Sequence, residues 1–395
     1  MSEALKLGIA GLGTVGIDAL KLIAMHGERF ASRTGCAVEV GGVSARSRRK
    51  NRDIDISPYE WFDDAVALAK SEDIDVFVEL IGGEDGVAKA SVEAALKAGK
   101  HVVTANKALL AHHGVELARL ADAKGVALSF EAAVAGGIPA IKTIRESLLA
   151  NKITRVYGIL NGTCNYILTA MRESGRKFDD VLAEAQEKGY AEADPSFDVD
   201  GVDTAHKLAI LAGVAFGCRL DFEAVHIEGV RHISPLDIQF AEELGYRIKL
   251  LGIATRTEHG VEQRVHPCMV PLAAPIAHIE DVFNAVVVDG DFIDTTMYEG
   301  RGAGAGPTAS AVVADLIDIA RGARVPTFAL PVKDMEPFKA APPESRRGAY
   351  YIRLMALDRP GVFADVADVL RDNDISMEAV LQRGRAPGEA VPVVM

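Results

Sequence analysis

The sequence is poor in cysteine and in positive charge. Its four cysteines (Cys36, Cys164, Cys218 and Cys268) show no CxxC spacing, which argues against a zinc knuckle or a disulfide framework and agrees with a reducing cytosol. The formal net charge of -13 argues against a protein that binds nucleic acid or a membrane surface as a whole. Any bound anion must therefore meet a local basic patch.

Long apolar runs and targeting signals are absent as well. No stretch of about 18 consecutive apolar residues occurs, and the N-terminus lacks a basic segment followed by a cleavable apolar one. We therefore expect a soluble, cytoplasmic chain. With 395 residues, 49% of them hydrophobic, the chain is long enough for two or three domains.

A glycine motif, GLGTVG, stands near the N-terminus. An apolar run at residues 5–10 predicts a strand before it, and a helical pattern follows it. In this context the first two glycines would let the backbone approach a pyrophosphate, and the third would let helix and strand pack closely. The candidate dinucleotide-binding residues are Gly11, Leu12, Gly13, Thr14, Val15 and Gly16.

A basic loop, ARSRRK at residues 45–50, follows the second predicted strand at 37–44. An acidic residue here would bind the ribose 2′-hydroxyl of NAD, whereas cations can pair with the 2′-phosphate of NADP. The loop favours NADP without excluding NAD. Arg46 and Ser47, nearest to the strand end, are the candidate ligands, and a solvated basic loop is the plain alternative.

Strands and helices alternate up to residue 130. We predict strands at 74–80, from His101, and at 126–130, and helices at 58–69, 86–98 and 108–123. This alternation predicts an α/β fold with a doubly wound parallel sheet. Ligands bind at the carboxyl ends of such strands, so Lys107, which follows the strand at His101, is well placed to meet cofactor or substrate.

The pattern changes after Pro139. A helix to residue 149, a strand at 153–160, a turn at 161–163 and a helix at 178–188 are predicted first. Strands at 246–256, 261–271 and 282–288 then follow without helices, which predicts an antiparallel sheet in an α+β domain. The run at 298–307 is too glycine-rich for a strand and precedes a helix at 308–320. It predicts a close backbone approach to a ligand or an interdomain hinge.

The most promising catalytic segment is AEADPSFDVDGVDTAHKL at residues 191–208. It places five carboxylates ahead of Lys207, and its apolar spacing predicts a helix from Gly201 that stops at Gly213 or Gly217. Asp203 and Lys207 would then lie one turn apart on one side. An acid-rich helix start with a surface ion pair explains these residues equally well in isolation.

Residues 326–347 form a proline-rich polar segment before a smaller unit. A strand at 350–356, a helix at 362–372 and a strand at 375–382 predict part of a βαββαβ domain. We expect a dinucleotide-binding domain at 1–137, completed by a helix at 307–321, and a catalytic α+β domain at 138–306. A linker at 322–348 and the partial unit at 349–395 complete the chain.

Several motifs occur together in the order typical of one family. They are GLGTVG (11–16), TANK (104–107), EAAVAGGIP (131–139), GILNGTCNYI (158–167), the stretch 191–208, and GRGAGAGPTASAVVADL (300–316). Over nearly its whole length the chain resembles homoserine dehydrogenase, in the longer bacterial form with a C-terminal ACT domain. The resemblance implies a Rossmann domain and NAD(P)-dependent interconversion of L-homoserine and L-aspartate 4-semialdehyde, on the route to threonine and methionine.

The resemblance also implies roles for individual residues. Lys207 matches the family's proton donor and acceptor, Lys107 its second active-site lysine, and Asp203 the residue that orients Lys207. Further matches are the substrate-pocket positions Glu192, Asp198 and Thr163, and the cofactor positions Thr104, Lys107 and Gly304. A lysine suits aldehyde reduction because it can stabilise charge that grows on oxygen and then give up a proton. Asp194 and Asp200 are expected to be turn and cap residues.

A cation, an effector and an oligomer are implied in the same way. Glu131 and the backbone carbonyls of Val134, Gly136 and Ile138 match the family's sodium site, which we take to be structural because hard oxygen ligands suit such a cation. Family ACT domains often carry a threonine site, so threonine is a candidate effector, although this unit is expected to lack its last strand and helix. We expect a homodimer or a higher homo-oligomer.

Two other functions are compatible with the sequence. A different two-domain semialdehyde reductase would act through a cysteine nucleophile, for which Cys164 is the candidate. A non-catalytic NADP-binding sensor would use the C-terminal unit to bind an amino acid. The sensor would bind these ligands without turnover.

Overall fold

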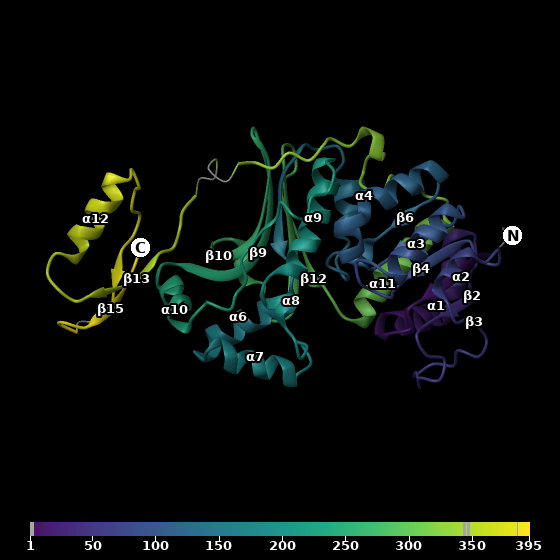
Figure 1. Cartoon of the computed structure of the whole chain (residues 1–395), viewed down its shortest axis with the longest axis horizontal. Coiled ribbons are helices and arrows are strands. Elements are labelled where there is room, and N and C mark those ends of the chain that lie inside the picture. The colour runs from purple at the N-terminus through teal and green to yellow at the C-terminus, as the bar shows by residue number, and fades with distance from the viewer. Residues whose placement is uncertain (1–3, 343–344, 346–347, 385) are drawn as a thin grey trace.

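The computed structural model describes residues 4–342, 345, 348–384 and 386–395. Three parts follow one another along the longest axis of the molecule, with the N-terminal part at one end and the C-terminal unit at the other (Figure 1). A long segment crosses the middle part to reach the C-terminal unit. Residues 343–344 and 346–347 of the predicted linker lie outside the described residues.

The N-terminal part is built on a parallel sheet with the strand order β3-β2-β1-β4-β5-β6. Its strands are β1 (Leu5–Ala10), β2 (Val38–Ser44), β3 (Glu60–Phe62), β4 (Val76–Glu79), β5 (His101–Thr104) and β6 (Leu128–Ser129). The chain winds outward from β1 in both directions, so the topological switch point lies between β1 and β4, where doubly wound sheets bind ligands. The predicted doubly wound sheet is confirmed.

Helices cover this sheet. They are α1 (Thr14–Thr34), α2 (Ala65–Lys70), α3 (Val87–Lys97), α4 (Lys107–Lys124) and, from much later in the chain, α11 (Ala305–Ala320). Val312 and Leu316 of α11 share a buried core with Leu20 and Ile23 of α1. Residues about 300 positions apart in sequence therefore pack together beside the glycine motif.

The helix predicted at 58–69 is wrong in its first half. Residues Glu60–Phe62 form β3 and pair with β2, and α2 begins only at Ala65. The carboxylate of Asp64 accepts hydrogen bonds from the N–H groups of Val66 and Ala67, which makes Asp64 the N-cap. Aromatic residues such as Trp61 favour a strand where a sheet edge offers a partner.

The middle part contains a mixed sheet with the order β12-β11-β7-β9-β10-β8. Its strands are β7 (Ile153–Ile159), β8 (His226–Ile227), β9 (Tyr246–Thr257), β10 (Gly260–Pro271), β11 (Phe283–Gly290) and β12 (Asp294–Arg301). All neighbours are antiparallel except β8 and β10. The statement that 298–307 is too glycine-rich for a strand is wrong for residues 298–301, because continuous pairing of β12 with β11 outweighs the low strand propensity of glycine.

Helices surround this sheet and connect it to the first. They are η1 (Glu131–Ala133), α5 (Ala140–Lys142), the π-helical η2 (Thr143–Ser147), α6 (Gly162–Ser174), α7 (Phe178–Glu187), α8 (Ser196–Val199), α9 (Val202–Phe216), α10 (Pro235–Glu243), η3 (Pro275–His278) and η4 (Val332–Asp334). The turn predicted at 161–163 is wrong, because Asn161 caps α6 and Gly162 begins it. None of the described helices is both long and apolar enough to cross a bilayer.

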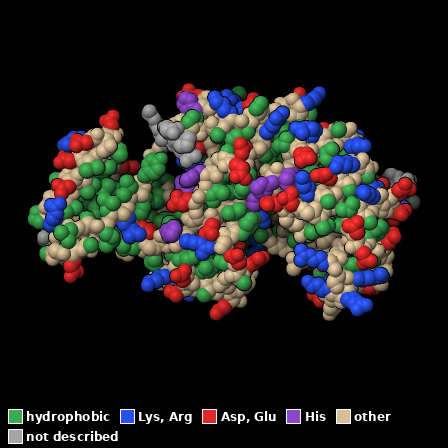
Figure 2. Space-filling view, viewed as in Figure 1, with side chains coloured by type: hydrophobic (Ala, Val, Ile, Leu, Met, Phe, Trp, Pro, Cys, Tyr) green, Lys and Arg blue, Asp and Glu red, His purple; other side chains and the backbone are tan. Residues whose placement is uncertain are grey.

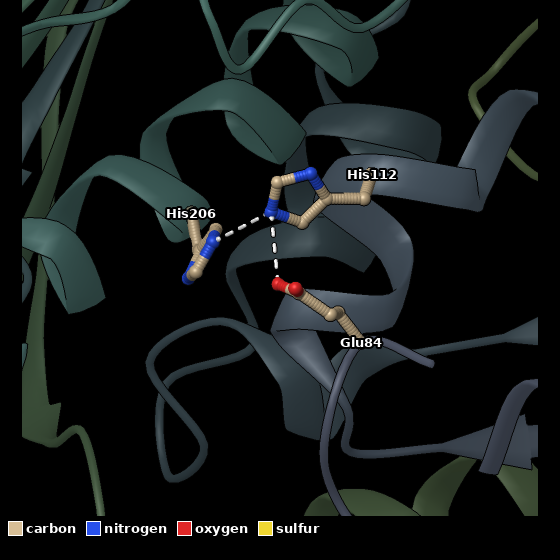
Figure 3. A group of neighbouring side chains, drawn as sticks. All are labelled: Glu84, His112 and His206. Atoms are coloured by element: carbon tan, nitrogen blue, oxygen red, sulfur yellow. Dashed lines mark hydrogen bonds and ion pairs between the residues drawn. The ribbon is translucent and has the colours of Figure 1, made fainter. Parts of the chain in front are cut away.

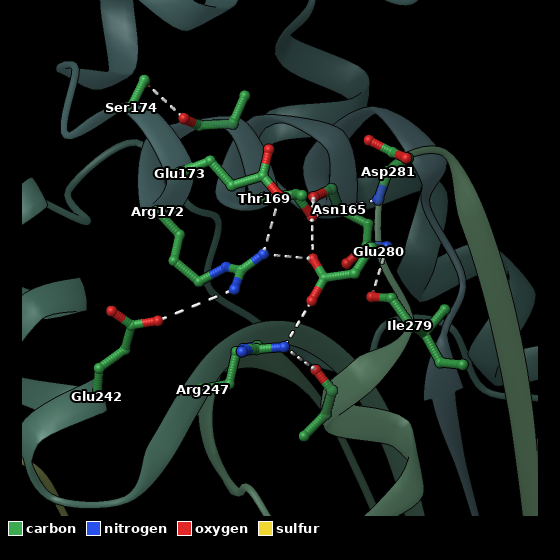
Figure 4. A network of polar contacts seen from close by, with 12 residues as sticks. Asn165, Thr169, Arg172, Glu173, Ser174, Glu242, Arg247, Ile279, Glu280 and Asp281 are labelled. Atoms are coloured by element: carbon green, nitrogen blue, oxygen red, sulfur yellow. Dashed lines mark hydrogen bonds and ion pairs between the residues drawn. The ribbon is translucent and has the colours of Figure 1, made fainter.

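A polar network fastens α6 to β9 and to the segment before β11 (Figure 4). The carboxylate of Glu280 accepts from Arg172 at 3.1 Å and from Arg247 at 2.6 Å. Lys249, with an exposed fraction of 1%, donates to Asn165 and to the carbonyl of Ile279. Burial lowers the pKa of Lys249 to about 8 despite the nearby Glu280. These contacts give Lys249 a structural role.

The C-terminal unit contains β13 (Arg353–Leu357), α12 (Val362–Asp372), β14 (Leu381–Gln382) and β15 (Ala390–Val394), with the sheet order β13-β15-β14. The strand predicted at 375–382 is therefore confirmed only for its last two residues. Arg353 pairs with Asp237 of α10 at 2.6 Å. Apolar side chains gather on the surface of this unit in Figure 2, and Met355, Val369 and Ile375 are more than half exposed.

The third glycine of the motif supports a stability prediction. A Cβ at Gly16 would lie 2.0 Å from the carbonyl oxygen of Gly11, whereas a Cβ at Gly27, in the same helix, would meet no atom within 4 Å. Gly16→Ala should lower the free energy of unfolding by about 1–3 kcal/mol, because backbone cannot yield as a side chain can. Gly27→Ala should raise it by about 0.5–1 kcal/mol. Urea unfolding of both variants measures the contrast, and equal effects would contradict it.

Candidate active site

Two lysines from different parts of the chain meet on one carboxylate. Lys207 Nζ lies 2.7 Å from Asp203 Oδ2, and Lys107 Nζ lies 2.9 Å from Asp203 Oδ1. Asp203 and Lys207 are one turn apart on α9, as their spacing predicted, whereas Lys107 begins α4 at the end of β5. The packing of α4 against α9 brings the two lysines together.

Within the described part of the chain, Lys207 donates to two acceptors, which leaves one of its N–H groups available. The ammonium donates to Asp203 and, at 2.7 Å, to the backbone carbonyl of Leu160, which directly follows β7. A lysine ammonium has three N–H groups. With an exposed fraction of 7% for Lys207, the third can reach a small molecule with little competition from water. The surface ion pair considered for this helix is therefore excluded, because Asp203 and Lys207 are both buried.

The two lysines differ in proton affinity. Burial lowers the pKa of Lys207, and the positive charge of Lys107 adds to this effect against the opposing charge of Asp203. Burial also lowers the pKa of Lys107. The negative charge of Asp203, followed by those of Asp198 and Glu192, outweighs burial and raises this pKa overall. Lys207 thus loses its proton more readily than Lys107, which holds its positive charge more firmly.

Asp203 stays ionised because of the lysines. Burial alone would raise the pKa of Asp203, but the charges of Lys207 and Lys107 hold it well below its usual range. The amide nitrogen of Asn161 also donates to Asp203 at 2.8 Å. A buried carboxylate between two cations is stable in its charged form.

Asn161 links Asp203 to the predicted substrate residues. Its amide nitrogen also donates to Asp198 at 2.8 Å, and its side-chain oxygen caps α6. The hydroxyl of Thr163 contacts Asp198 at 3.2 Å and donates to the carbonyl of Tyr190 at 2.8 Å. Burial and the charge of Asp203 raise the pKa of Asp198. Asn161 was missed from the sequence, although a polar residue between a strand and a helix is a recognisable N-cap signal.

The other acids of the stretch 191–208 separate into two groups. Glu192 is exposed, and its charge acts on Lys107. Asp194 accepts from the N–H of Ser196, and Asp200 pairs with Arg231, so these two have the turn and ion-pair contacts of structural residues. Phe197 lies between Asp194 and Asp200 in sequence, and the centroid of its ring is 5.6 Å from Lys107 Nζ.

The glycine motif has the shape that a dinucleotide requires. Gly11 has a φ of 104°, and a Cβ there would lie 2.3 Å from the carbonyl oxygen of Leu80. Gly13 is exposed, and a Cβ there would meet no protein atom within 4 Å. Gly13 is also the N-cap of α1 and offers no side-chain oxygen to its first amides. Open space in front of these amides fits a pyrophosphate.

The basic loop lies beside this motif. Arg46 and Ser47 are exposed directly after β2. Arg52, which the sequence did not single out, donates to the carbonyls of Ser47 and Leu12 at 2.8 and 3.4 Å. The guanidinium groups of Arg48 and Arg52 each lie 5.9 Å from the ring of Trp61. Arg52 therefore holds the basic loop against the glycine motif.

The remaining predicted cofactor residues have different surroundings. The hydroxyl of Thr104 donates to Glu79 at 2.5 Å and accepts from the N–H of Asn106, so it is already used within the protein. Glu79, also missed from the sequence, is fully buried and accepts from the N–H groups of Ile81 and Gly82 at the switch point. Gly304 is the N-cap of α11 with a φ of 111°.

The predicted sodium ligands lie in one buried segment. Both oxygens of Glu131 accept backbone N–H groups, from Ile141 and Lys142. Burial, and then the charge of Asp315, raise the pKa of Glu131 to about 7. Val134, Gly136 and Ile138 are buried around Ala135, whose φ of 52° reverses the chain. The charge of Lys142 offsets the effects of burial and of Asp315 only in part, and a buried carboxylate of this kind is a ligand that suits a hard cation.

Cys164 cannot act as the nucleophile of the alternative reductase. It is fully buried, and its sulfur lies 3.3 Å from the carbonyl of Asp198. Burial, and then the charges of Asp198 and Asp203, raise the pKa of the thiol well above its usual range. A substrate therefore cannot reach the thiol, and the thiol does not ionise to the thiolate that a nucleophile requires.

Two family models match the chain. The model described as homoserine dehydrogenase matches residues 139–317, and the one described as its NAD-binding domain matches residues 11–131. Homoserine dehydrogenase of Pseudomonas aeruginosa is 49% identical over 387 residues, covering 96% of this chain and 88% of that protein. The enzyme of Neisseria gonorrhoeae is 45% identical over 388 residues, covering 97% and 89%.

Solved structures agree with these matches. The crystal structure of a homoserine dehydrogenase from Thiobacillus denitrificans has a TM-score of 0.94 and 45% identity, covering 100% of this chain and 91% of that one. A hyperthermophilic archaeal homoserine dehydrogenase in complex with NADPH has a TM-score of 0.71 and 27% identity, covering 82% and 99%.

Because two lysines pair with Asp203, a substitution there should change the stability of the fold. Asp203→Asn should lower the free energy of unfolding at neutral pH by about 3 kcal/mol, because two cations lose their buried partner. The pKa of Asp203 is depressed in the folded state, so its contribution is present above the unfolded value near 4 and lost as pH falls below it. The difference between wild type and variant should therefore shrink in acid.

Urea unfolding between pH 3 and pH 7 measures this effect. Asp194→Asn, an exposed acid of the same stretch, is the matched control and should leave the unfolding midpoint unchanged. An Asp203→Asn variant as stable as wild type at pH 7 would show that the carboxylate does not hold the lysines together.

Proposed function

The chain belongs to the homoserine dehydrogenase family of NAD(P)-dependent oxidoreductases that act on a CH–OH group, and from this premise we propose that Lys207 carries the proton in its reaction. The reaction interconverts L-homoserine and L-aspartate 4-semialdehyde. The observation that supports Lys207 is its buried ammonium, which donates to Asp203 and Leu160 and keeps one N–H group available.

Lys207 acts as the general acid in aldehyde reduction. When bound, the reduced nicotinamide supplies a hydride to the aldehyde carbon. The free N–H of Lys207 donates to the aldehyde oxygen, where negative charge develops, and then transfers its proton. In the reverse direction the neutral amine removes the hydroxyl proton of homoserine. A lowered pKa suits both directions, because the amine can lose and regain the proton.

Lys107 and Asp203 complete the proton site. Asp203 orients Lys207 through a 2.7 Å contact and holds Lys107 at 2.9 Å. Lys107 retains its charge because its pKa is raised, so it adds a fixed positive field near the reacting oxygen. Asp203 and Lys207 are buried on α9, which limits the access of water to their ion pair.

Glu192, Asp198 and Thr163 form the proposed substrate pocket. A free carboxylate such as Glu192 is suited to bind the ammonium group of the amino-acid substrate. Asp198, whose oxygens contact Asn161 and Thr163, presents the second carboxylate. The acids of 191–208 thus explain recognition of an amino acid and of its positive charge.

NADP is the proposed cofactor, with residues 11–16 at the pyrophosphate and Arg46 and Ser47 at the 2′-phosphate. The exposed guanidinium of Arg46 after β2 supports this choice over NAD, because no acid occupies the loop at 45–50. Gly304 supports a second backbone approach to the cofactor from the start of α11, which packs against α1. Thr104 supports the site indirectly through Glu79.

We also propose a structural sodium ion at Glu131 and the carbonyls of Val134, Gly136 and Ile138. It would offset the buried negative charge of Glu131 beside Asp315.

The division of the chain into domains at 1–137 with 307–321, 138–306, 322–348 and 349–395 remains our proposal, supported by the two separate sheets. A homodimer is supported by the free edge of β12. The threonine effector and the cytoplasmic location stay predictions.

The catalytic role of Lys207 is tested by kinetics. Lys207→Ala should lower kcat by about two or more orders of magnitude, the scale of general acid catalysis, with the Kd of NADPH unchanged. Lys124→Ala, an exposed lysine in the last turn of α4, is the control. A kcat close to that of wild type would assign the proton to another group.

The pH dependence gives a second readout for the same residue. The pKa of Lys207 lies below its usual value of 10.5, so the ammonium needed for aldehyde reduction should be lost as pH rises through this lowered pKa. The rate of reduction should fall and that of oxidation should rise across the same range. In Lys207→Ala, neither the fall in the rate of reduction nor the rise in the rate of oxidation should occur across this range.

Cofactor choice is tested at the basic loop. Arg46→Ala should reduce kcat/KM for NADP by about tenfold or more, the value of a charge-assisted contact, and change kcat/KM for NAD by much less. Arg33→Ala, exposed at the opposite end of α1 from the glycine motif, is the matched control. An unchanged ratio between the two cofactors would remove Arg46 from the site.

A further inference from the structure

Two histidines and a glutamate converge beside the active site, where neither the sequence nor the catalytic mechanism assigns them a role. Glu84 follows β4, His112 belongs to α4 and His206 belongs to α9 (Figure 3). His112 Nε2 lies 3.2 Å from His206 Nε2 and 3.3 Å from Glu84 Oε2. One ligand atom from each residue lies within 4.8 Å of the others.

These separations match the edges of a metal coordination polyhedron. Ligands of a tetrahedral zinc ion at about 2.0–2.1 Å lie about 3.3 Å from one another. The separations of 3.2 and 3.3 Å from His112 Nε2 agree with that value, and Glu84 and His206 lie within 4.8 Å of one another. Two imidazoles and one carboxylate, with a fourth position open, form a frequent zinc ligand set.

Hydrogen bonding alone satisfies this cluster poorly. A neutral imidazole carries one proton and one lone pair, on different nitrogens. His112 Nε2 faces both a carboxylate and a second Nε2, so a single proton must serve two acceptors. The Nδ1 of His206 is buried and has no hydrogen-bond partner among the described residues. An ion that accepts one lone pair from each residue ends the competition for the His112 Nε2 proton and leaves the proton of His206 on Nδ1.

Packing fixes the rings in position. His206 has an exposed fraction of 3%, stacks on Phe222 with centroids 4.4 Å apart, and lies 5.5 Å from Phe197. His112 lies 4.8 Å from the ring of Phe222. The side chains of His112 and Glu84 are 25% and 54% exposed, so the cluster is open to solvent on the Glu84 side. Rigid imidazoles with an open outer face are the features of a preformed site.

We propose that Glu84, His112 and His206 bind one divalent transition-metal ion of the zinc type. The ion connects the segment after β4 and helix α4 to helix α9. Because Lys207 directly follows His206, the occupied site holds the proton-carrying helix against the cofactor domain. The ion takes no part in hydride or proton transfer, so the site is independent of the proposed reaction.

A neighbouring pair of residues provides a matched control. His113 and Asp85 follow His112 and Glu84 directly and form their own pair at 3.0 Å, outside the cluster. His113→Gln and Asp85→Asn therefore remove the same chemical groups from the same two segments. They should leave metal binding unchanged.

The test is metal binding to the purified full chain after removal of metal with a chelator. Titration calorimetry with Zn²⁺ should give one site per chain, and Co²⁺ should give the visible absorption of a four-coordinate ion. His112→Gln and Glu84→Gln should each weaken binding by at least about tenfold, since loss of even a hydrogen-bond partner of a ligand costs about 10- to 100-fold. Zn²⁺ should also raise the Tm of wild type by a few degrees.

Equal Zn²⁺ affinity for wild type and His112→Gln would overturn the proposal, as would equal losses in His112→Gln and His113→Gln. Circular dichroism of each variant without metal separates loss of a ligand from loss of folding. Steady-state turnover of the metal-free wild type tests the catalytic assignment separately, so the two failures can be told apart.

Discussion

The contact of one buried carboxylate with two lysines is the interaction on which the proposed catalytic centre depends. At an exposed fraction of 3%, Asp203 remains charged chiefly because of the two lysines, and Lys207 donates to it. The two lysines of this contact differ in pKa. Burial lowers the pKa of Lys207, whereas the surrounding acids raise the pKa of Lys107. Two identical side chains thus differ in their affinity for a proton.

This contact also joins the two sheets. Lys107 begins α4 at the end of a parallel strand, and Asp203 lies on α9, which packs against β7 and β9 of the mixed sheet. The Glu84, His112 and His206 cluster bridges the same boundary. Any relative movement of the two sheets would therefore change the separation of the catalytic groups. The reactive centre is a property of the interface between them.

Local signals were sufficient for much of the fold. The order of strand, glycine motif and helix predicted β1 and α1, and Gly11 and Gly16 indeed lie where a side chain would strike backbone. The spacing in 191–208 predicted α9 and the one-turn separation of Asp203 and Lys207. The errors at 58–69 and 298–301 share one cause: both segments are edge strands, in which pairing with the neighbouring strand outweighs local propensity.

The sequence by itself determined that Asp203 and Lys207 lie one turn apart on a helix, because residue type and helical spacing are local properties. It could not determine that Lys107, about 100 residues before Lys207, shares Asp203 with it, or that Asn161 and Leu160 complete the site. It also left open the direction of the Lys207 pKa, since burial lowers it and neighbouring acids raise it. Only the tertiary structure decides that balance, because desolvation and distance between charges are set by packing.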